Sequence, residues 1–190
     1  RIYKGLAKYT SNFIPASTDP DIVPDSPSGV SYSSNVALVP STDGAVAFDG
    51  SGDWLASNTD QKQNFTFGTG NFTIEMWAYF NNVTNNMALY DGRPSGTNGA
   101  YNTIILDGST STIQYQANTS IQITSAPVVA STWYHIAIAR SGSTITAYLN
   151  GTSFGTYTSS ATIGTAAKVL YIGSQGTSAE YFNGYISNFR

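Results

Sequence analysis

Carboxylate side chains are the first residues in this sequence that could do chemistry, because two of them side by side can cleave a glycosidic bond. A retaining mechanism needs two carboxyl groups about 5 to 5.5 Å apart, one as nucleophile and one as acid. The sequence holds two glutamates, Glu75 and Glu180, which lie far apart, and the run Thr-Ile-Glu-Met-Trp around Glu75 contains no second carboxylate. We therefore expect no catalytic residue, and we interpret Glu75 as a strand residue tied to a hydrogen-bond partner.

The sequence contains few residues that could support nucleophilic catalysis or a thiolate metal site. The chain has no cysteine, so neither a disulfide framework nor a cysteine-ligated zinc or iron–sulfur site is available. His135 is the single histidine, and it follows Trp133 and Tyr134 at the start of an alternating segment. A histidine-paired nucleophile would have to use it, but we expect its imidazole to serve packing and hydrogen bonding.

The stretch from residue 132 to residue 152 best shows the elements that must position these side chains. Apolar residues recur at every second position on both of its arms, the run Ser-Gly-Ser at 141–143 joins the arms, and Asn150-Gly151 closes the second arm. Asn-Gly supplies the positive φ angles that a tight turn needs. The pattern predicts antiparallel hairpins in the middle of a β-sandwich.

Short alternating segments with Gly, Asn or Asp at the breaks follow one another about every 8 to 12 residues from residue 30 onward, which is typical of a closed or two-sheet β architecture. The predicted strands are 36–39, 45–49, 54–57, 72–80, 87–90, 102–106, 112–117, 120–124, 133–140, 144–149, 152–158, 169–172 and 182–190. No segment shows sustained helical periodicity.

The alternation along residues 72–80 also assigns side chains to faces. Phe72, Ile74 and Met76 share one face of the predicted strand, and Trp77 and Tyr79 lie on the other. A strand of a sandwich meets the facing sheet on one side only. We therefore expect the aromatic rings on the second face to be covered by loops or by a partner.

Four motifs carry a resemblance to a known family: Ala-Val-Ala-Phe-Asp-Gly-Ser-Gly-Asp-Trp-Leu at 45–55, Gly-Asn-Phe-Thr-Ile-Glu-Met-Trp-Ala-Tyr-Phe at 70–80, the Trp-x-His hairpin at 132–152, and Phe-Asn-Gly-Tyr-Ile-Ser-Asn-Phe-Arg at 182–190. In this order they resemble the laminin G-like, concanavalin A-like jelly-roll superfamily. The resemblance implies an all-β fold, a two-sheet antiparallel jelly-roll sandwich of the concanavalin A-like type. This scaffold hosts lectins, adhesion modules, hydrolases and virion parts, so function must be argued from a site.

The resemblance also implies calcium at the sandwich rim, and calcium takes six to eight oxygen ligands. Asp49, Asp53 and Asp91 stand in Gly-containing turns that could converge there, and they are the candidate metal ligands. None of them matches a dedicated calcium loop. Because Asp-Gly in a β protein is also an ordinary turn, a purely structural role for the three aspartates stays open.

Sugar binding is the commonest recognition task of the family, and it needs an aromatic platform with amides and hydroxyls around it. The longest connections after the linker are 50–57 and 91–103, and binding usually sits on long loops of a rigid sandwich. The candidate sugar-binding residues that flank these loops are Trp54, Tyr90, Arg93, Tyr101 and Asn102. Packing of Trp54 beneath its own turn is the alternative.

The first 29 residues differ in composition from the rest. The prolines at 15, 20, 24 and 27 exclude a helix or a central strand, so we predict a Pro-rich linker over 16–29 and a jelly-roll domain over 30–190. In phage-type tandem laminin G-like proteins, the last strand of a module resembles residues 184–190 and continues into a segment that resembles residues 1–15. We predict that residues 1–15 belong to a preceding repeat or to a subunit contact, although the tail of an unrelated neighbour is an alternative.

This hypothesis makes copies of the chain, or adjacent repeats, the partners of each molecule. A terminal segment would pair with an open sheet edge, and main-chain hydrogen bonds would give the affinity. Head-to-tail contacts of this kind do not close on themselves and propagate into filaments. The predicted assembly residues are Ile2, Tyr9, Phe13, Ile14, Tyr185 and Phe189.

Composition excludes several classes of function. With 190 residues the chain fits one all-β domain. Its 8 basic against 11 acidic residues, with no basic run, give no footprint for nucleic acid. No apolar run approaches a membrane span of about 18 residues, so we expect no membrane insertion. The sparse charge resembles that of bacterial surface or phage-exposed β proteins, which predicts an extracellular, cell-surface or virion-surface location.

The sequence thus predicts a non-enzymatic structural module of an extracellular fibre, filament or virion appendage, joined head to tail through its terminal segments. A carbohydrate-binding adhesion domain that recognises glycans is the alternative. Because the chain begins with Arg1, we expect a processed product or a part of something longer.

Overall fold

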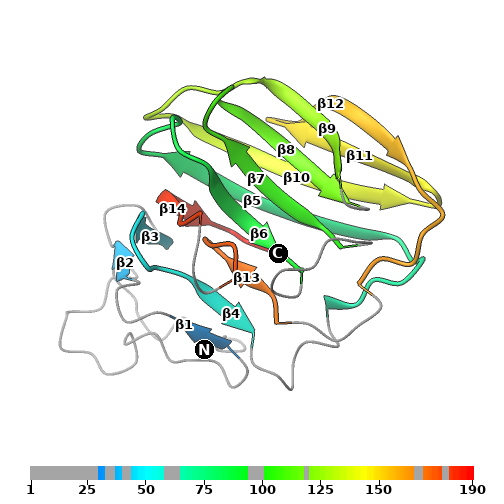
Figure 1. The fold of residues 1–190 in the computed structure, drawn as a ribbon, viewed down its shortest axis with the longest axis horizontal. Helices are drawn as coiled ribbons and strands as arrows, with labels where there is room; N and C mark the ends of the chain where they lie inside the picture. Colours follow the sequence, from blue (N-terminus) through cyan, green and yellow to red (C-terminus); the bar gives the residue numbers. More distant parts are fainter. Residues whose placement is uncertain are drawn as a thin grey trace, which may run out of the picture.

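Two antiparallel sheets make up the fold in the computed structural model (Figure 1). The structure describes residues 30–32, 37–39, 44–57, 65–93, 101–117, 120–164, 169–176 and 180–190. These residues form fourteen β-strands and no α-helix, which confirms the predicted all-β class. Within these ranges, no helix has the length and apolar character that a membrane crossing requires.

Each sheet has seven strands, and all neighbouring strands pair antiparallel. Sheet A has the order β1 (Val30–Tyr32), β4 (Leu55–Ser57), β13 (Tyr171–Ile172), β6 (Met87–Asp91), β7 (Thr103–Asp107), β8 (Thr112–Ala117) and β9 (Ser120–Pro127). Sheet B has the order β12 (Thr152–Thr158), β11 (Thr144–Leu149), β10 (Trp133–Ser141), β5 (Phe72–Phe80), β14 (Asn183–Ser187), β3 (Ala45–Asp49) and β2 (Ala37–Val39). The predicted two-sheet antiparallel jelly-roll sandwich is confirmed.

Several strand ends differ from the sequence pattern by one to three residues, as at β9, which runs to Pro127 and not to residue 124. The pattern gave no strand at β1, which has three residues. The stretch 182–190 was expected to be one strand, but β14 ends at Ser187 because Asn188 adopts a φ of 49°, which interrupts an extended backbone. The predicted segments 1–15 and 16–29 lie outside the described residues.

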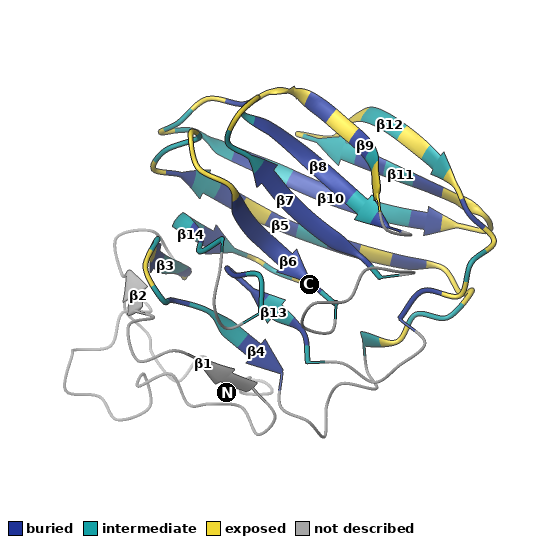
Figure 2. Ribbon diagram, viewed as in Figure 1, coloured by how far each residue is buried: buried dark blue, intermediate teal, exposed yellow. Residues whose placement is uncertain are grey.

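The hydrophobic core fills the space between the sheets, and most of β6, β7 and β8 is coloured as buried in Figure 2. On β5, Phe72, Ile74 and Met76 are buried and Trp77 is exposed, which confirms the predicted division of faces. Three phenylalanines interlock by edge-on packing, with centroid distances of 5.7 Å between Phe48 and Phe182 and 5.5 Å between Phe80 and Phe182. Burying each such side chain stabilises the fold by about 1.5–3 kcal/mol.

Gly184 allows β14 to lie directly against β5. A Cβ atom at this position would overlap the carbonyl oxygen of Tyr79. Close approach of two backbones is one of the uses of glycine within a strand. The contact places Tyr185 opposite Tyr79 in the strand register.

Candidate functional site

Aromatic side chains form a row across the outer face of sheet B, the face that points away from sheet A. The strand register places Tyr79 of β5 opposite Trp133 of β10 on one side and opposite Tyr185 of β14 on the other. The ring centroids lie 5.5 Å apart for Tyr79 and Trp133 and 5.6 Å apart for Tyr79 and Tyr185. The row therefore crosses three neighbouring strands without a gap.

Trp77 lies next to this row, two residues before Tyr79 on the same strand. Its neighbours in the register are His135 and Ser187, and its ring centroid is 5.3 Å from that of His135. Trp77 is 41% exposed, the most of any aromatic side chain in the described residues. Together with the aromatic row, Trp77 forms a contiguous aromatic surface on this face, and exposed contiguous apolar patches mark interaction sites.

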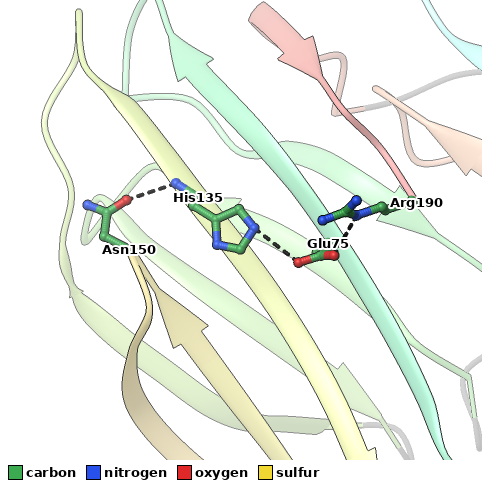
Figure 3. A network of polar contacts seen from close by, with 4 residues as sticks. All are labelled: Glu75, His135, Asn150 and Arg190. Atoms are coloured by element: carbon green, nitrogen blue, oxygen red, sulfur yellow. Dashed lines mark hydrogen bonds and ion pairs between the residues drawn. The ribbon is translucent and has the colours of Figure 1, made fainter.

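Figure 3 shows a polar network of Glu75, His135, Asn150 and Arg190, in which Glu75 stands two residues before Trp77 on β5. The Nε2 atom of His135 lies 3.1 Å from Oε2 of Glu75, and Nε of Arg190 donates to Oε1 of Glu75 at 2.6 Å. Asn150 holds the histidine from the other side, because its Oδ1 accepts the His135 N–H at 2.8 Å and its own N–H donates to the His135 carbonyl at 2.7 Å. Glu75 and His135 thus both have the hydrogen-bond partners that the sequence analysis expected.

A β-bulge after β14 turns Arg190 toward the network. Ser187 stands opposite Trp77, and Arg190 exchanges two main-chain hydrogen bonds with Glu75, so three steps along one strand match two steps along the other. The extra residue comes at Asn188, whose φ is 49°. Bulges characteristically redirect side chains, and here Phe189 packs against the core while Arg190 points outward.

The Arg190 guanidinium holds the pKa of Glu75 below its ordinary value, since it donates a hydrogen bond to the carboxylate and its charge favours the ionised form. His135 adds to this effect, and partial burial opposes it. Glu75 is therefore ionised at neutral pH and acts only as a hydrogen-bond acceptor.

The aromatic residues and the polar network lie on one face of sheet B. We call this set the sheet B site, and its members are Glu75, Trp77, Tyr79, Trp133, His135, Tyr185 and Arg190.

Two of the predicted sugar-binding residues are interior residues. Tyr90 is 2% exposed and packs with Phe189 at a centroid distance of 6.2 Å, and burial raises its pKa well above the ordinary value. Asn102 is 3% exposed, and its Oδ1 accepts a hydrogen bond from the Tyr115 hydroxyl. Neither side chain is on the surface where a sugar ring could stack.

The other predicted sugar-binding residues are partly accessible. Trp54 packs edge-on against Tyr171 at a centroid distance of 5.8 Å. Arg93 forms a bidentate ion pair with Asp91, with nitrogen–oxygen distances of 3.0 and 3.2 Å. Tyr101 is half-buried. A sugar site at these three residues stays a prediction.

The predicted calcium ligands do not form a cluster. Asp91 pairs with Arg93, while Asp53 accepts the N–H of Asp49, and Asp49 accepts the N–H of Ser51. Nowhere in the described ranges do three or more acidic, histidine or cysteine side chains gather in a way that could hold a metal ion. Calcium binding at these aspartates stays a prediction.

Sequence reasoning located only part of the sheet B site. Alternation put Trp77 and Tyr79 on the outer face, and the search for catalytic residues led to Glu75 and His135 as hydrogen-bonding residues. It did not connect Arg190 with Glu75, because the two residues are 115 positions apart and a bulge sets the facing of Arg190. The pattern Glu-x-Trp-x-Tyr on one predicted strand was the available signal for a shared face.

Residues 49–190 match a laminin G-type family model described as the concanavalin A-like lectin/glucanases superfamily. The chain belongs to this superfamily. No curated protein sequence gave a match.

Solved structures of the same fold include botulinum neurotoxins and their binding domains. A structure of botulinum neurotoxin type C, whose cell entry is described as dependent on two ganglioside molecules, has a TM-score of 0.60 and 15% identity, covering 84% of this chain and 42% of that one. The binding domain of botulinum neurotoxin DC with rat synaptotagmin II has a TM-score of 0.59 and 16% identity, with the same coverage of 84% and 42%. This chain thus spans less than half of those toxin chains.

A domain of an extracellular enzyme is similar over most of its length. Domain 4 of a GH43 arabinanase from Geobacillus stearothermophilus, in complex with arabinotriose, has a TM-score of 0.62 and 14% identity, covering 83% of this chain and 75% of that one. At these identities the likeness establishes the shared fold.

Proposed function

We propose that this chain is a non-catalytic glycan-binding module and that the sheet B site is its binding face. The observation that carries the proposal is the exposure of Trp77, 41% of its surface, beside a continuous row of aromatic rings. Ligand sites combine apolar and aromatic surface with a few placed polar groups. The rings of Trp77 and its neighbours offer a platform for the C–H face of a sugar, and Glu75, His135 and Arg190 offer partners for its hydroxyl groups.

The similar structures support this proposal through what they are described to bind. The arabinanase domain was solved with arabinotriose, and the toxin study concerns ganglioside molecules. These are properties of those proteins. The fold they share with this chain is one on which saccharide recognition can be built.

The surroundings of Glu75 support a non-catalytic role. Its two carboxylate oxygens are hydrogen-bonded to Arg190 and His135. Neither partner is a carboxylic acid, and a glycosidase needs a second carboxyl group beside the first. Glu180 lies in the loop beside β6, where its carbonyl accepts the Ala88 N–H. Incubation of the protein with polysaccharides should release no reducing ends, and cleavage that disappears in Glu75→Gln would contradict this part of the proposal.

Glycan-array screening followed by calorimetry on the best ligand tests the binding face. Trp77→Ala should weaken binding by about tenfold or more, because truncating a central aromatic anchor commonly costs over 1.4 kcal/mol. Trp54→Ala is the matched control, since Trp54 is a tryptophan of the earlier predicted set and lies outside the sheet B site. Circular dichroism checks that both variants fold.

Two results would contradict the proposal. One is the absence of any glycan ligand for the unmodified protein. The other is binding that survives Trp77→Ala and is lost in Trp54→Ala, which would move the site to the loops around 50–57 and 91–103.

A second candidate function is the assembly role predicted from the terminal segments. The observation that favours it is strand pairing beyond β14, where Arg190 exchanges main-chain hydrogen bonds with Glu75. Thr73, which is exposed, is the next residue of β5 whose backbone groups face the same edge as those of Glu75. A further strand segment could therefore continue the hydrogen-bond ladder beyond Arg190. Of the predicted assembly residues, Tyr185 is in the sheet B site, Phe189 packs against the core, and the remaining four lie outside the described residues.

Removal of residues 1–15 tests the assembly role. The shortened protein should stay folded and lose its ability to form filaments, as judged by electron microscopy and size-exclusion chromatography. Normal polymerisation of the shortened protein would contradict strand exchange. Both candidate functions are consistent with a location outside the cell, on a cell surface or on a virion surface.

A further inference from the structure

The charges within the sheet B site cancel. Glu75 is the acidic member and Arg190 the basic member, and their side chains form an ion pair of 2.6 Å. The remaining members are four aromatic residues and His135, whose Nε2 lies within hydrogen-bond distance of the same carboxylate. Glu75 and Arg190 therefore contribute no net charge to the site, and the Arg190 guanidinium, although 78% exposed, is already paired with a carboxylate.

Glu75 keeps the capacity to accept further hydrogen bonds. Its Oε1 accepts from Arg190 and its Oε2 from His135, and a carboxylate has about four lone-pair positions. The side chain is 21% exposed, so part of the carboxylate faces solvent. The groups that suit the remaining positions are donors such as sugar hydroxyls.

The charge around the site also disfavours an acidic ligand. Asp49 stands opposite Asn183 in the register of β3 and β14, near one edge of the aromatic row. The whole chain carries a formal net charge of −3 at pH 7. Like charges brought together at an interface are strongly unfavourable.

The aromatic row sets the direction of the ligand. Tyr185, Tyr79 and Trp133 lie on three neighbouring strands, which are spaced about 4.8 Å apart in a sheet. The row is therefore about 10 Å wide across the strands, more than a single sugar ring covers.

Resting on the proposed function, we infer that the ligand of the sheet B site is an uncharged oligosaccharide that lies across β14, β5 and β10. One ring stacks on Trp77, and a hydroxyl group of the ligand donates to Glu75. Saccharides that carry sialic acid or a uronic acid are excluded, because their carboxylates would face Glu75.

A comparison of matched ligands on the unmodified protein tests this inference. The probes are neutral oligosaccharides and the same oligosaccharides capped with sialic acid or glucuronic acid, measured by glycan array and then by calorimetry. We expect the neutral member of each pair to bind at least about tenfold more tightly, a difference of about 1.4 kcal/mol.

The variant Glu75→Gln supplies an independent readout. It removes the repelling charge, so the neutral-to-acidic affinity ratio should fall toward one even if both affinities change. Glu180→Gln is the matched control, because it removes an equal charge outside the site and should leave the ratio unchanged.

The outcomes separate the inference from the proposed function. Equal or tighter binding of the acidic ligands that still depends on Trp77 would overturn the inference and leave the glycan-binding face in place. An unchanged affinity ratio in Glu75→Gln would also overturn it. Failure of every saccharide to bind would overturn both.

Discussion

Glu75 and Arg190 are joined through backbone and side chain at once. The Glu75 N–H donates to the Arg190 carbonyl at 2.8 Å, the Arg190 N–H donates to the Glu75 carbonyl at 3.0 Å, and Arg190 Nε donates to Glu75 Oε1 at 2.6 Å. The backbone pair fixes where the guanidinium can reach. The charge balance of the outer face of sheet B is therefore set by strand register.

The pairing of Glu75 makes stability depend on pH. Because the folded-state pKa of Glu75 is lowered from 4.5 by Arg190 and His135, the stabilisation is complete above this ordinary value and is lost as pH falls through the lowered pKa. Glu75→Gln should be less stable than the unmodified protein at pH 7, by up to about 1 kcal/mol for an accessible ion pair. Urea unfolding from pH 7 to pH 3 should show the difference narrowing below pH 4.5, and a difference that stays constant to pH 3 would contradict the assignment.

Gly184 should tolerate no side chain. Gly184→Ala places a Cβ against the Tyr79 carbonyl oxygen, and overpacking against backbone should cost at least about 3 kcal/mol. Gly142→Ala is the control, since Gly142 has a φ of 60° with nothing within 4 Å of the added Cβ, and it should cost about 1–2 kcal/mol for the left-handed backbone alone. Chemical denaturation measures both, and equal losses would contradict the close approach of β14 and β5.

Arg140 fastens loops at one end of the sandwich. It is 4% exposed and donates to the carbonyl oxygens of Gly142, Gly68, Ala161 and Ser159 at 2.9 to 3.1 Å. Arg140→Met leaves these acceptors without the guanidinium and should lower the free energy of unfolding by about 3 kcal/mol or more. Arg140→Lys keeps the charge but not the planar guanidinium, so its stability should lie between those of the unmodified protein and Arg140→Met. A loss under about 1 kcal/mol in Arg140→Met would contradict this role of Arg140.

Glu180 should respond to pH with the opposite sign to Glu75. Burial raises its pKa, nearby Arg93 counteracts this in part, and its Oε2 has no hydrogen-bond partner. A raised carboxyl pKa favours the folded state at low pH and disfavours it once pH exceeds the folded-state pKa. Glu180→Gln should therefore stabilise the protein at pH 7, because the amide is uncharged at every pH, and the gain should be about 1.4 kcal/mol for each unit by which burial raises the carboxyl pKa. Thermal unfolding at pH 4 and pH 7 should show the gain only at pH 7, and a variant that is less stable at pH 7 would contradict this account.

The sequence by itself determined the fold class and the two faces of β5. A period of two residues dictates which side chains can share a face, so Phe72, Ile74 and Met76 could be assigned to the core and Trp77 to the outside before any coordinates. The turn at Asn150 and Gly151 was likewise readable, because its positive φ angles of 51° and 78° suit these two residue types.

Only the tertiary structure decided which distant residues meet. Tyr90 and Asn102 stand at the ends of predicted strands that flank a long loop, yet both side chains lie inside the protein, because the bulge in the pairing of β6 with β7 and the packing of Phe189 are invisible to local periodicity. Arg190 reaches Glu75 because a single residue with positive φ, Asn188, shifts the alternation after β14. Alternation specifies a face relative to the neighbouring residues of one strand, whereas the partner across the sheet follows from register, bulges and close glycine contacts, which arise only when the strands are assembled.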